Sequence, residues 1–248
     1  MSEMISFGGG VNSVAMTIML VEGGWRGPIV FADTGGEWPE TYCYQRYFER
    51  EWLRPRGLEI TVVSPRTDAG LYDDKRLGGL RGIDTLEQYC LSRGIIPLLS
   101  QRWCTVEFKH HPLDNWKKRA GIERTCIGFT VDEGHRKRRE GMRYPLLEED
   151  VTRQECLRIV HRAGLAYPTP SRCFFCPGQD LASLRRLYTE HRDLYDRAVA
   201  LEDKARRCNQ QWATLDPHGI SLRQHAERRW QGQERMDLSQ WFPCICTL

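Results

Sequence analysis

The first third of the chain alternates between short apolar runs and longer segments with helical spacing of apolar residues. An apolar run ends at three glycines (8–10), and the segment that follows, from Val11 to Met19, places its apolar residues on one helical face. A second apolar run ends at Asp33, and Pro39 marks where another helix begins. The β-branched run 58–63 is typical of a buried strand. The order β-α-β-α-β predicts an α/β fold with a parallel sheet flanked by helices.

The later pattern predicts fewer strands and more helix. We expect helices over 84–92 and 112–119 and a strand over 124–129, and we interpret the charged stretch 133–143 as a flap. Thr152 is followed three residues later by a glutamate, a capping-box spacing that predicts the start of a helix. Amphipathic helices are expected between residues 180 and 207. These patterns predict an α/β nucleotide-binding domain over 1–150 and a mostly helical, cysteine-containing region over 151–248 packed on it.

Composition narrows the cellular setting. The 248 residues contain no run of about 20 apolar residues and begin with no basic-plus-apolar leader, so we expect a soluble, cytoplasmic protein with no membrane partner. Intracellular thiols are kept reduced, so the ten cysteines indicate metal ligation, catalysis or burial rather than a disulfide framework.

Charge is unevenly spread along the chain. Residues 1–100 carry 10 Lys and Arg against 13 Asp and Glu, although the whole chain has 36 against 33. The basic excess therefore lies after residue 100. It fits either a solvated, arginine-rich helical surface or contact with DNA or tRNA, and the two interpretations stay open.

The glycine turn between the first strand and the first helix indicates phosphate binding. Backbone N–H groups converge at such a turn, and the positive end of the helix dipole adds to their attraction for an anion. A Walker loop is excluded because no Lys-Ser or Lys-Thr pair follows the glycines. A dinucleotide fingerprint fits Gly8, Gly10 and Asp33, but Ser13 stands where that motif has its third glycine.

Six stretches of the chain resemble segments of one known superfamily, and they occur in the family's order. "SFGGGVNS" resembles the pyrophosphate loop S-G-G-x-D-S of the adenine nucleotide alpha-hydrolases, and "FADTGGEWPETY" resembles the D-T-G-x-x-x-P-E-T segment of their phosphoadenosine phosphosulfate (PAPS) reductase-like branch. "RWCTVEFKHHPL", "IGFTVDEGHRKR" and "YPLLEED" resemble three further segments of that branch, and "PSRCFFCP" resembles its iron–sulfur members. The resemblance implies a Rossmann-like fold and ATP binding by a PP-loop.

The resemblance also implies roles for individual residues. Asp33 and Thr34 would flank the nucleoside, and Gly128 would lie near adenine or ribose. Serine hydroxyls and free N–H groups donate to phosphate oxygens, as the PP-loop requires. The residues expected to hold the phosphates are Ser6, Gly8, Gly9, Gly10, Asn12 and Ser13.

Three basic residues are the catalytic candidates. The resemblance implies that Lys109 faces the anionic end of the nucleotide and that Arg136 or Arg138 closes over the phosphates, where a guanidinium binds phosphate bidentately. Two residues depart from the family pattern, since Gly8 stands where the motif has Ser and Asn12 where it has Asp. The missing carboxylate makes the arrangement of Mg²⁺ less certain than nucleotide binding.

The pair Cys173 and Cys176 lies between two prolines at a spacing that can hold one metal centre. By itself C-x-x-C fits a redox pair or half of a zinc site. Cys104 is a third candidate ligand, because the resemblance places it where iron–sulfur members carry one, although Trp103 replaces the first cysteine of their Cys-Cys pair. We expect a 4Fe–4S cluster, with zinc or no metal as alternatives.

A cluster of this kind prefers four thiolates, so a fourth ligand is needed. We expect Cys156, because it lies on the helix that leads toward the C-x-x-C loop, although burial as a small apolar side chain explains it almost as well. Cys244 and Cys246 near the end of the chain are the rivals.

The resemblance implies an ATP pyrophosphatase that adenylates a substrate for sulfur transfer, as the Dnd-type DNA phosphorothioation enzymes and the cluster-bearing tRNA thiolases do. DNA or tRNA would be the substrate, and a sulfur-donor protein would be a partner. The first alternative is a sulfonucleotide (PAPS or APS) reductase, which ranks second because the chain lacks that family's Glu-Cys-Gly-x-His tail. The second alternative is a non-catalytic nucleotide-binding sensor, because Asn12 could impair turnover.

Overall fold

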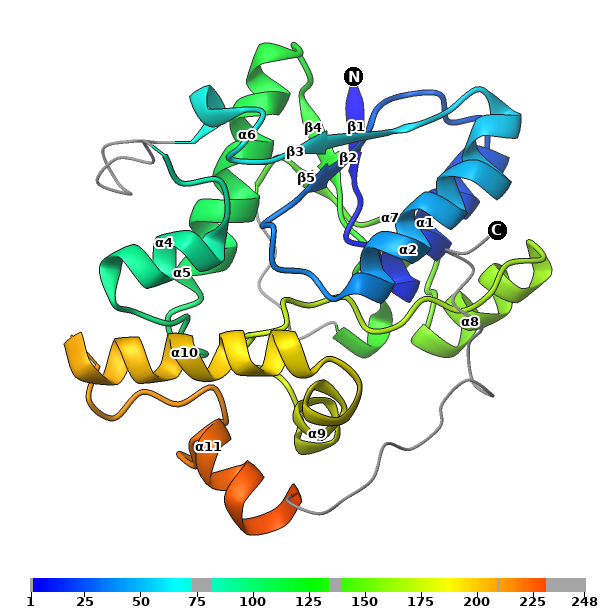
Figure 1. The fold of residues 1–248 in the computed structure, drawn as a ribbon. Helices are drawn as coiled ribbons and strands as arrows, with labels where there is room; N and C mark the ends of the chain where they lie inside the picture. Colours follow the sequence, from blue (N-terminus) through cyan, green and yellow to red (C-terminus); the bar gives the residue numbers. More distant parts are fainter. Residues whose placement is uncertain (1, 73–81, 134–139, 209, 231–248) are drawn as a thin grey trace.

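The structure, a computed structural model, describes residues 2–72, 82–133, 140–208 and 210–230. A sheet of five parallel strands lies at its centre, in the order β3-β2-β1-β4-β5 (Figure 1). Ile5 of β1 pairs with Ile29 of β2 on one side and with Cys126 of β4 on the other. The strands are β1 Glu3–Ser6, β2 Ile29–Ala32, β3 Ile60–Val63, β4 Arg124–Cys126 and β5 Met142–Arg143. The α/β fold expected from the sequence is confirmed.

Alternation along the central strands divides the interior into two cores. Met4 and Ile5 are both fully buried, but they contribute to different clusters, and Val30 and Phe31 of β2 do the same. Successive side chains of a strand point to opposite faces, so a run of apolar residues covers both sides of the sheet. Both faces must therefore be covered by helices.

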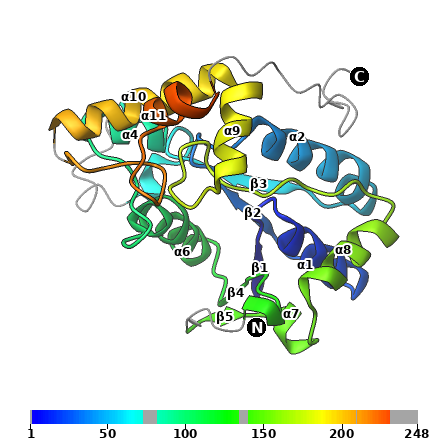
Figure 2. The ribbon, with the colours of Figure 1, turned by 90° about the horizontal axis from the view of Figure 1, so that it is seen from below.

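The first core lies under helices that follow β1 and β2 and under helices after β5. These are α1 Val11–Glu22, α2 Pro39–Phe48, α7 Pro145–Glu148 and α8 Arg153–Arg162, with the π-helical and 3-10 turns η1 Glu49–Leu53 and η2 Arg54–Arg56. Helix α8 packs along α1, which places it on the same side of the sheet (Figure 2).

The second core lies on the opposite face and includes most of the helices after residue 180. Helix α10 packs on α4, and α9 and α11 pack on α10 (Figures 1 and 2). The regular helices of this side are α4 Leu86–Arg93, α5 Trp103–Thr105, α6 His111–Arg119, α9 Leu181–Glu190, α10 Arg192–Cys208 and α11 Leu222–His225. The shorter turns of this side are η3 Ala69–Leu71, η4 Val106–His110 and η6 Ala226–Trp230. The turn η5 Val131–Glu133 instead contacts α1 and α8 of the first side.

Local sequence signals fix the helix ends. Pro39 occupies the first turn of α2, where its missing N–H costs nothing. Thr152 and Glu155 form the expected capping box at the start of α8, and Gly164 follows that helix with φ 73°. Strand β5 is not predicted from the sequence, since it lies in the stretch 133–143 that we interpret as a flap. A strand of two residues is too short to show a periodicity in the sequence.

The region after residue 150 lies on both sides of the sheet, since α8 joins the first core and α9–α11 join the second. Among the described helices, none combines the length and the apolar character needed to cross a membrane.

Candidate nucleotide and metal site

The glycine loop connects the end of β1 to the first turn of α1. Gly9 adopts φ 75°, a conformation that favours glycine, and Gly10 begins the helix with extended backbone and no side-chain cap. Within the described residues, the N–H groups of residues 8–13 donate to no protein acceptor. Unused donors at the positive end of a helix form an anion site.

Three polar side chains, those of Ser6, Asn12 and Ser13, belong to or flank the glycine loop. Ser13 Oγ donates to the Gly10 carbonyl over 2.9 Å, so it braces the loop. Ser6 is the last residue of β1 and is half-buried. Asn12 Nδ2 donates to Glu133 Oε2 over 2.9 Å, while its Oδ1 is buried without a partner among the described residues.

The contact with Glu133 explains why residue 12 is an amide rather than the aspartate of the family motif. A carboxylate at position 12 would face a second carboxylate, whereas the amide donates to it. Gly128, which was expected near adenine or ribose, packs against the start of α1, where an added Cβ would lie 3.1 Å from the Asn12 carbonyl oxygen and from Ser13 N. A side chain at position 128 would therefore crowd the first turn of α1.

A second loop follows β2, and the N–H groups of Gly35, Gly36 and Glu37 are satisfied within the protein. Asp33 Oδ1 accepts from Gly35 N over 2.8 Å and from the Tyr42 hydroxyl over 2.7 Å. Gly36 N donates to Thr34 Oγ1 over 3.3 Å, and Glu37 N donates to the Tyr42 hydroxyl oxygen over 3.3 Å. Burial, together with the nearby Asp33 carboxylate, raises the pKa of Tyr42, so its hydroxyl stays protonated and able to donate.

The segment before the C-x-x-C pair lies against this second loop. Phe174 N donates to the Gly36 carbonyl over 2.8 Å, and Trp38 N donates to the Arg172 carbonyl over 3.3 Å. Glu37 and Cys173 thereby form an antiparallel bridge. The Thr34 hydroxyl lies 3.2 Å from Cys173 Sγ. We name residues 168–177 the cysteine loop.

Three cysteines and the ion pair between the half-buried Lys109 and the buried Glu37 meet at the cysteine loop. Burial raises the pKa of the Cys104 thiol, and its neighbour Cys176 raises it further. Burial and the adjacent Glu37 raise the pKa of Cys173, against the opposing effect of Lys109. Lys109 Nζ lies 2.7 Å from Glu37 Oε1, whose side chain is fully enclosed. Burial alone would lower the pKa of Lys109, but the glutamate outweighs it and raises that pKa.

The structure does not bring Cys156 to this group. Cys156 is fully buried in the first core, where α8 packs on α1, whereas Cys104 and Cys173 pack against the second core. The fully buried Cys90 of α4 is a closer thiol that the sequence analysis did not single out, and its raised pKa comes from burial and from neighbouring Cys104. The rivals Cys244 and Cys246 lie outside the described residues, as do Arg136 and Arg138.

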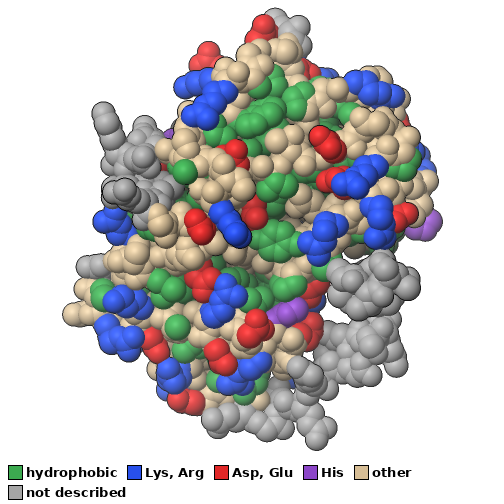
Figure 3. Space-filling model, turned by 45° about the horizontal axis from the view of Figure 1, so that its top comes forward, with side chains coloured by type: hydrophobic (Ala, Val, Ile, Leu, Met, Phe, Trp, Pro, Cys, Tyr) green, Lys and Arg blue, Asp and Glu red, His purple; other side chains and the backbone are tan. Residues whose placement is uncertain are grey.

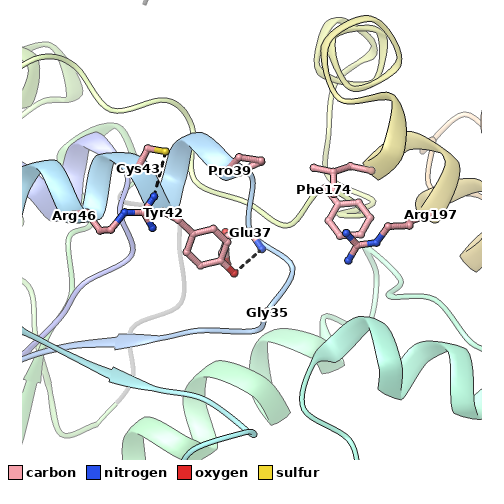
Figure 4. Close-up of a pocket in the computed structure, with 9 residues that line it drawn as sticks. Gly35, Glu37, Pro39, Tyr42, Cys43, Arg46, Phe174 and Arg197 are labelled. Carbon is pink, nitrogen blue, oxygen red and sulfur yellow. Dashed lines mark hydrogen bonds between the residues drawn. The ribbon is translucent and has the colours of Figure 1, made fainter. Parts of the chain in front are cut away.

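A cavity of about 330 Å³ opens beside the second loop (Figure 4). Phe174 of the cysteine loop lines this cavity together with Glu37, which bridges to that loop, and Arg197 lies over the Phe174 ring at 4.9 Å. Arginine and aromatic faces around an open space suit a planar or anionic group. The lining residues are Gly35, Glu37, Pro39, Tyr42, Cys43, Arg46, Phe174, Leu194 and Arg197.

A second cluster of metal-ligating side chains joins the start of α2 to the end of α9. Glu40, Glu190 and His191 bring one ligand atom each within 4.8 Å of one another. Arg186 pairs with both glutamates, so a guanidinium already provides the positive charge there. Burial alone would raise the pKa of Glu40, but the His191 hydrogen bond and Arg186 outweigh it and lower that pKa.

Comparison with known proteins supports the resemblance stated from the motifs. Residues 2–101 match the sequence profile of the phosphoadenosine phosphosulfate reductase domain family. An adenosine 5'-phosphosulfate reductase from Deinococcus radiodurans is 28% identical over 128 residues, which are 52% of this chain and 47% of the reductase. The chain thus matches about half the length of that relative. The N-terminal part of the chain is accordingly related to this reductase domain, as the sequence analysis predicted.

Two solved structures are similar to the fold. A phosphoadenylyl-sulfate reductase from Candida auris, in a phosphate complex, has a TM-score of 0.47 and 14% identity, over 68% of this chain and 75% of the reductase. The U34-tRNA thiolase NcsA from Methanococcus maripaludis, solved with its 4Fe–4S cluster, has a TM-score of 0.44 and 14% identity, over 84% of this chain and 72% of the thiolase.

Proposed function

We propose that the protein is an ATP pyrophosphatase that adenylates a substrate for sulfur transfer. One observation carries this proposal: the unused N–H groups of residues 8–13 lie next to a loop that contributes two members of a three-cysteine group. A phosphate site beside thiols fits activation by ATP followed by sulfur chemistry.

The proposed reaction has two displacements. A substrate oxygen attacks the α-phosphorus of ATP, the bond to the bridging oxygen breaks, and pyrophosphate leaves. A sulfide-level nucleophile then displaces AMP, which carries the substrate oxygen away and leaves sulfur in its place. Catalysis of the first step depends on positioning and charge stabilisation by the loop N–H groups, with Arg136 and Arg138 as proposed contributors.

The cysteines near the cysteine loop support the proposal of a metal cluster. Besides burial, Cys176 raises the pKa of both Cys104 and Cys173, and Cys104 raises the pKa of Cys90. We propose the first three as ligands of a 4Fe–4S cluster, with Cys90 in place of Cys156 as the fourth. When bound, the cluster would supply a site for sulfide. Lys109, which is near Cys173, offsets the negative charge that ligating thiolates bring.

The loop also fits Mg²⁺ at one point. Asn12 Oδ1 is buried without a partner among the described residues and lies on the side chain that contacts the Glu133 carboxylate. Oxygen atoms of this kind are the ligands that Mg²⁺ prefers, and one or two of them suffice when phosphates provide the rest. We propose that Glu133 supplies the carboxylate that Asn12 lacks.

The acceptor of sulfur is proposed to be a nucleic acid. The support is the excess of Lys and Arg after residue 100. The face shown in Figure 3 has Lys and Arg interspersed with Asp and Glu, so contact on that face would be local rather than spread over one basic patch.

The activity is tested with purified protein and labelled nucleotides. Pyrophosphate release from ATP that increases with DNA or tRNA, and sulfur-containing nucleosides by mass spectrometry, are expected. Sulfite release from a phosphosulfate, with no pyrophosphate from ATP, would instead support the sulfonucleotide reductase that the family match favours. Nucleotide binding with neither product would support the sensor.

Cluster ligation is tested by anaerobic purification, visible spectra and metal analysis of three serine variants. Cys104→Ser and Cys90→Ser are expected to lose iron and colour. Cys156→Ser is the matched control, since it changes an equally buried thiol in the other core. A colourless protein that contains zinc would contradict the proposed iron–sulfur cluster. Iron loss in Cys156→Ser alone would identify Cys156, and not Cys90, as the fourth ligand.

A further inference from the structure

Ser171 of the cysteine loop lies directly on the glycine loop, although the two are about 160 residues apart in the chain. Its hydroxyl donates to the Gly8 carbonyl. A Cβ placed on Gly9 would lie 3.7 Å from Ser171 Oγ, and one placed on Gly10 would lie 3.8 Å from Ser171 Cβ. Ser171 therefore covers the glycines from the outside, on the side that an added side chain would fill.

The backbone of Ser171 faces the same loop. A Cβ on Gly10 would lie 4.0 Å from Ser171 N. The Ser171 N–H has no acceptor within the parts of the chain that the structure describes, and neither have those of residues 8–13. The hydroxyl and the N–H of Ser171, from the cysteine loop, are therefore additional donors beside the N–H groups of residues 8–13.

Neighbouring contacts hold Ser171 in this position. Pro168 and Pro170 restrict the backbone on its N-terminal side. On its C-terminal side the Arg172 carbonyl accepts from Trp38 N over 3.3 Å, and Cys173 bridges to Glu37. The serine is therefore presented by a segment whose backbone is restrained on both sides.

We propose that Ser171 is a phosphate-binding residue of the nucleotide site, supplied by the cysteine loop. When a phosphate occupies the glycine loop, the Ser171 hydroxyl rotates from the Gly8 carbonyl to a phosphate oxygen, and its N–H donates alongside. The proposal rests on the nucleotide site proposed above and extends it to a residue far outside the glycine motif. The cysteine loop, which contains Cys173, would then also form one side of the phosphate site.

The test uses a pair of substitutions that differ only in charge. Ser171→Asn and Ser171→Asp both remove the hydroxyl and add nearly the same volume. Beside a bound triphosphate, we expect Ser171→Asn to weaken ATP binding about threefold and Ser171→Asp about thirtyfold, because only the carboxylate repels phosphate. Adenosine should bind both variants with equal affinity. Isothermal titration of the full chain with ATP and with adenosine measures this.

Ser2→Asn and Ser2→Asp are the matched controls, since Ser2 is exposed just before β1, at the opposite end of the strand from the glycine loop. Equal ATP affinities are expected for that pair, and circular dichroism melting checks that all four variants fold. Equal ATP affinities for Ser171→Asn and Ser171→Asp would show that the serine only braces the loop, and would overturn the inference while leaving the nucleotide site intact. Failure of the unsubstituted protein to bind ATP would overturn both.

Discussion

The loops after β1 and β2 are both rich in glycine and both lie at the carboxyl edge of the sheet, but they use their backbone donors in opposite ways. In the described residues, the N–H groups of residues 8–13 find no acceptor, whereas those of Gly35, Gly36, Glu37 and Trp38 are all bonded within the protein. The first loop is open to an external anion. The second is a rigid support on which the cysteine loop is built.

The comparison predicts that glycine substitutions in the second loop damage stability first. A Cβ at Gly35 would lie 2.8 Å from the Thr85 Cβ, and Gly35 has φ 69°. Gly35→Ala is therefore expected to lower the free energy of unfolding by about 4 kcal/mol, from crowding and backbone strain together. Urea unfolding followed by circular dichroism measures it.

Gly57→Ala is the control for Gly35→Ala, because Gly57 has φ 73° and open space around its Cβ position. It should cost only about 1 kcal/mol, from backbone strain alone. Equal losses for the two variants would mean that the second loop is not tightly packed against Thr85.

The ion pair between Lys109 and the enclosed Glu37, behind the second loop, gives the next largest effect. Lys109→Met leaves the enclosed Glu37 carboxylate without its cation, and the free energy of unfolding should fall by about 3 kcal/mol. The double variant Lys109→Met/Glu37→Gln should recover much of this loss, because no buried charge remains. A double variant as unstable as Lys109→Met would contradict this account of the pair.

In the first loop, a glycine substitution should affect binding more than stability. A Cβ at Gly9 would lie 3.1 Å from Thr41 Cγ2 and beside Ser171. Gly9→Ala is expected to weaken ATP binding about thirtyfold, or about 2 kcal/mol, because the methyl group crowds Thr41 and Ser171 and strains the loop whose N–H groups bind phosphate. Isothermal titration measures the affinity.

Gly24→Ala is matched to Gly9→Ala in its positive φ, here 95°, but nothing lies near its Cβ position. It should keep the ATP affinity of the unsubstituted protein. Weaker ATP binding in Gly24→Ala would show that strain at any such glycine reaches the nucleotide site.

The smallest effect concerns the hydroxyl of Tyr42 on α2, which is bonded to the second loop. Tyr42→Phe removes the group that donates to Asp33 and accepts from Glu37 N, and should cost about 1 kcal/mol of unfolding free energy. ATP affinity should stay unchanged, since that hydroxyl belongs to the support. A large loss of ATP affinity with little loss of stability would reverse the assignment of the two loops.

Much of the fold could be predicted from local patterns. The strand, glycine turn and helix at the start of the chain, the helix start at Pro39 and the capping box at Thr152 all depend on residues within a few positions of each other. Strand β5 could not be predicted, because its two residues are held by pairing with Thr125 and Cys126 rather than by their own pattern.

The candidate site was harder to predict, because its contacts join distant segments. Cys156 precedes the cysteine loop closely in sequence, but the sequence does not tell which face of the sheet its helix covers. Cys90 has no motif and becomes a candidate only through its place beside Cys104. Ser171 likewise has no signal apart from its position two residues before Cys173, and only the folded chain shows the Gly8 contact.

The antiparallel bridge between Glu37 and Cys173 has a consequence for how the protein folds. It joins residues 136 positions apart, so the entropy of closing a long segment must be overcome before Cys173 reaches its neighbours. Strand pairing between β1 and β2 spans far fewer residues and can form earlier. During refolding, the central strands are therefore expected to be protected from hydrogen exchange before the thiols of residues 104, 173 and 176 gather.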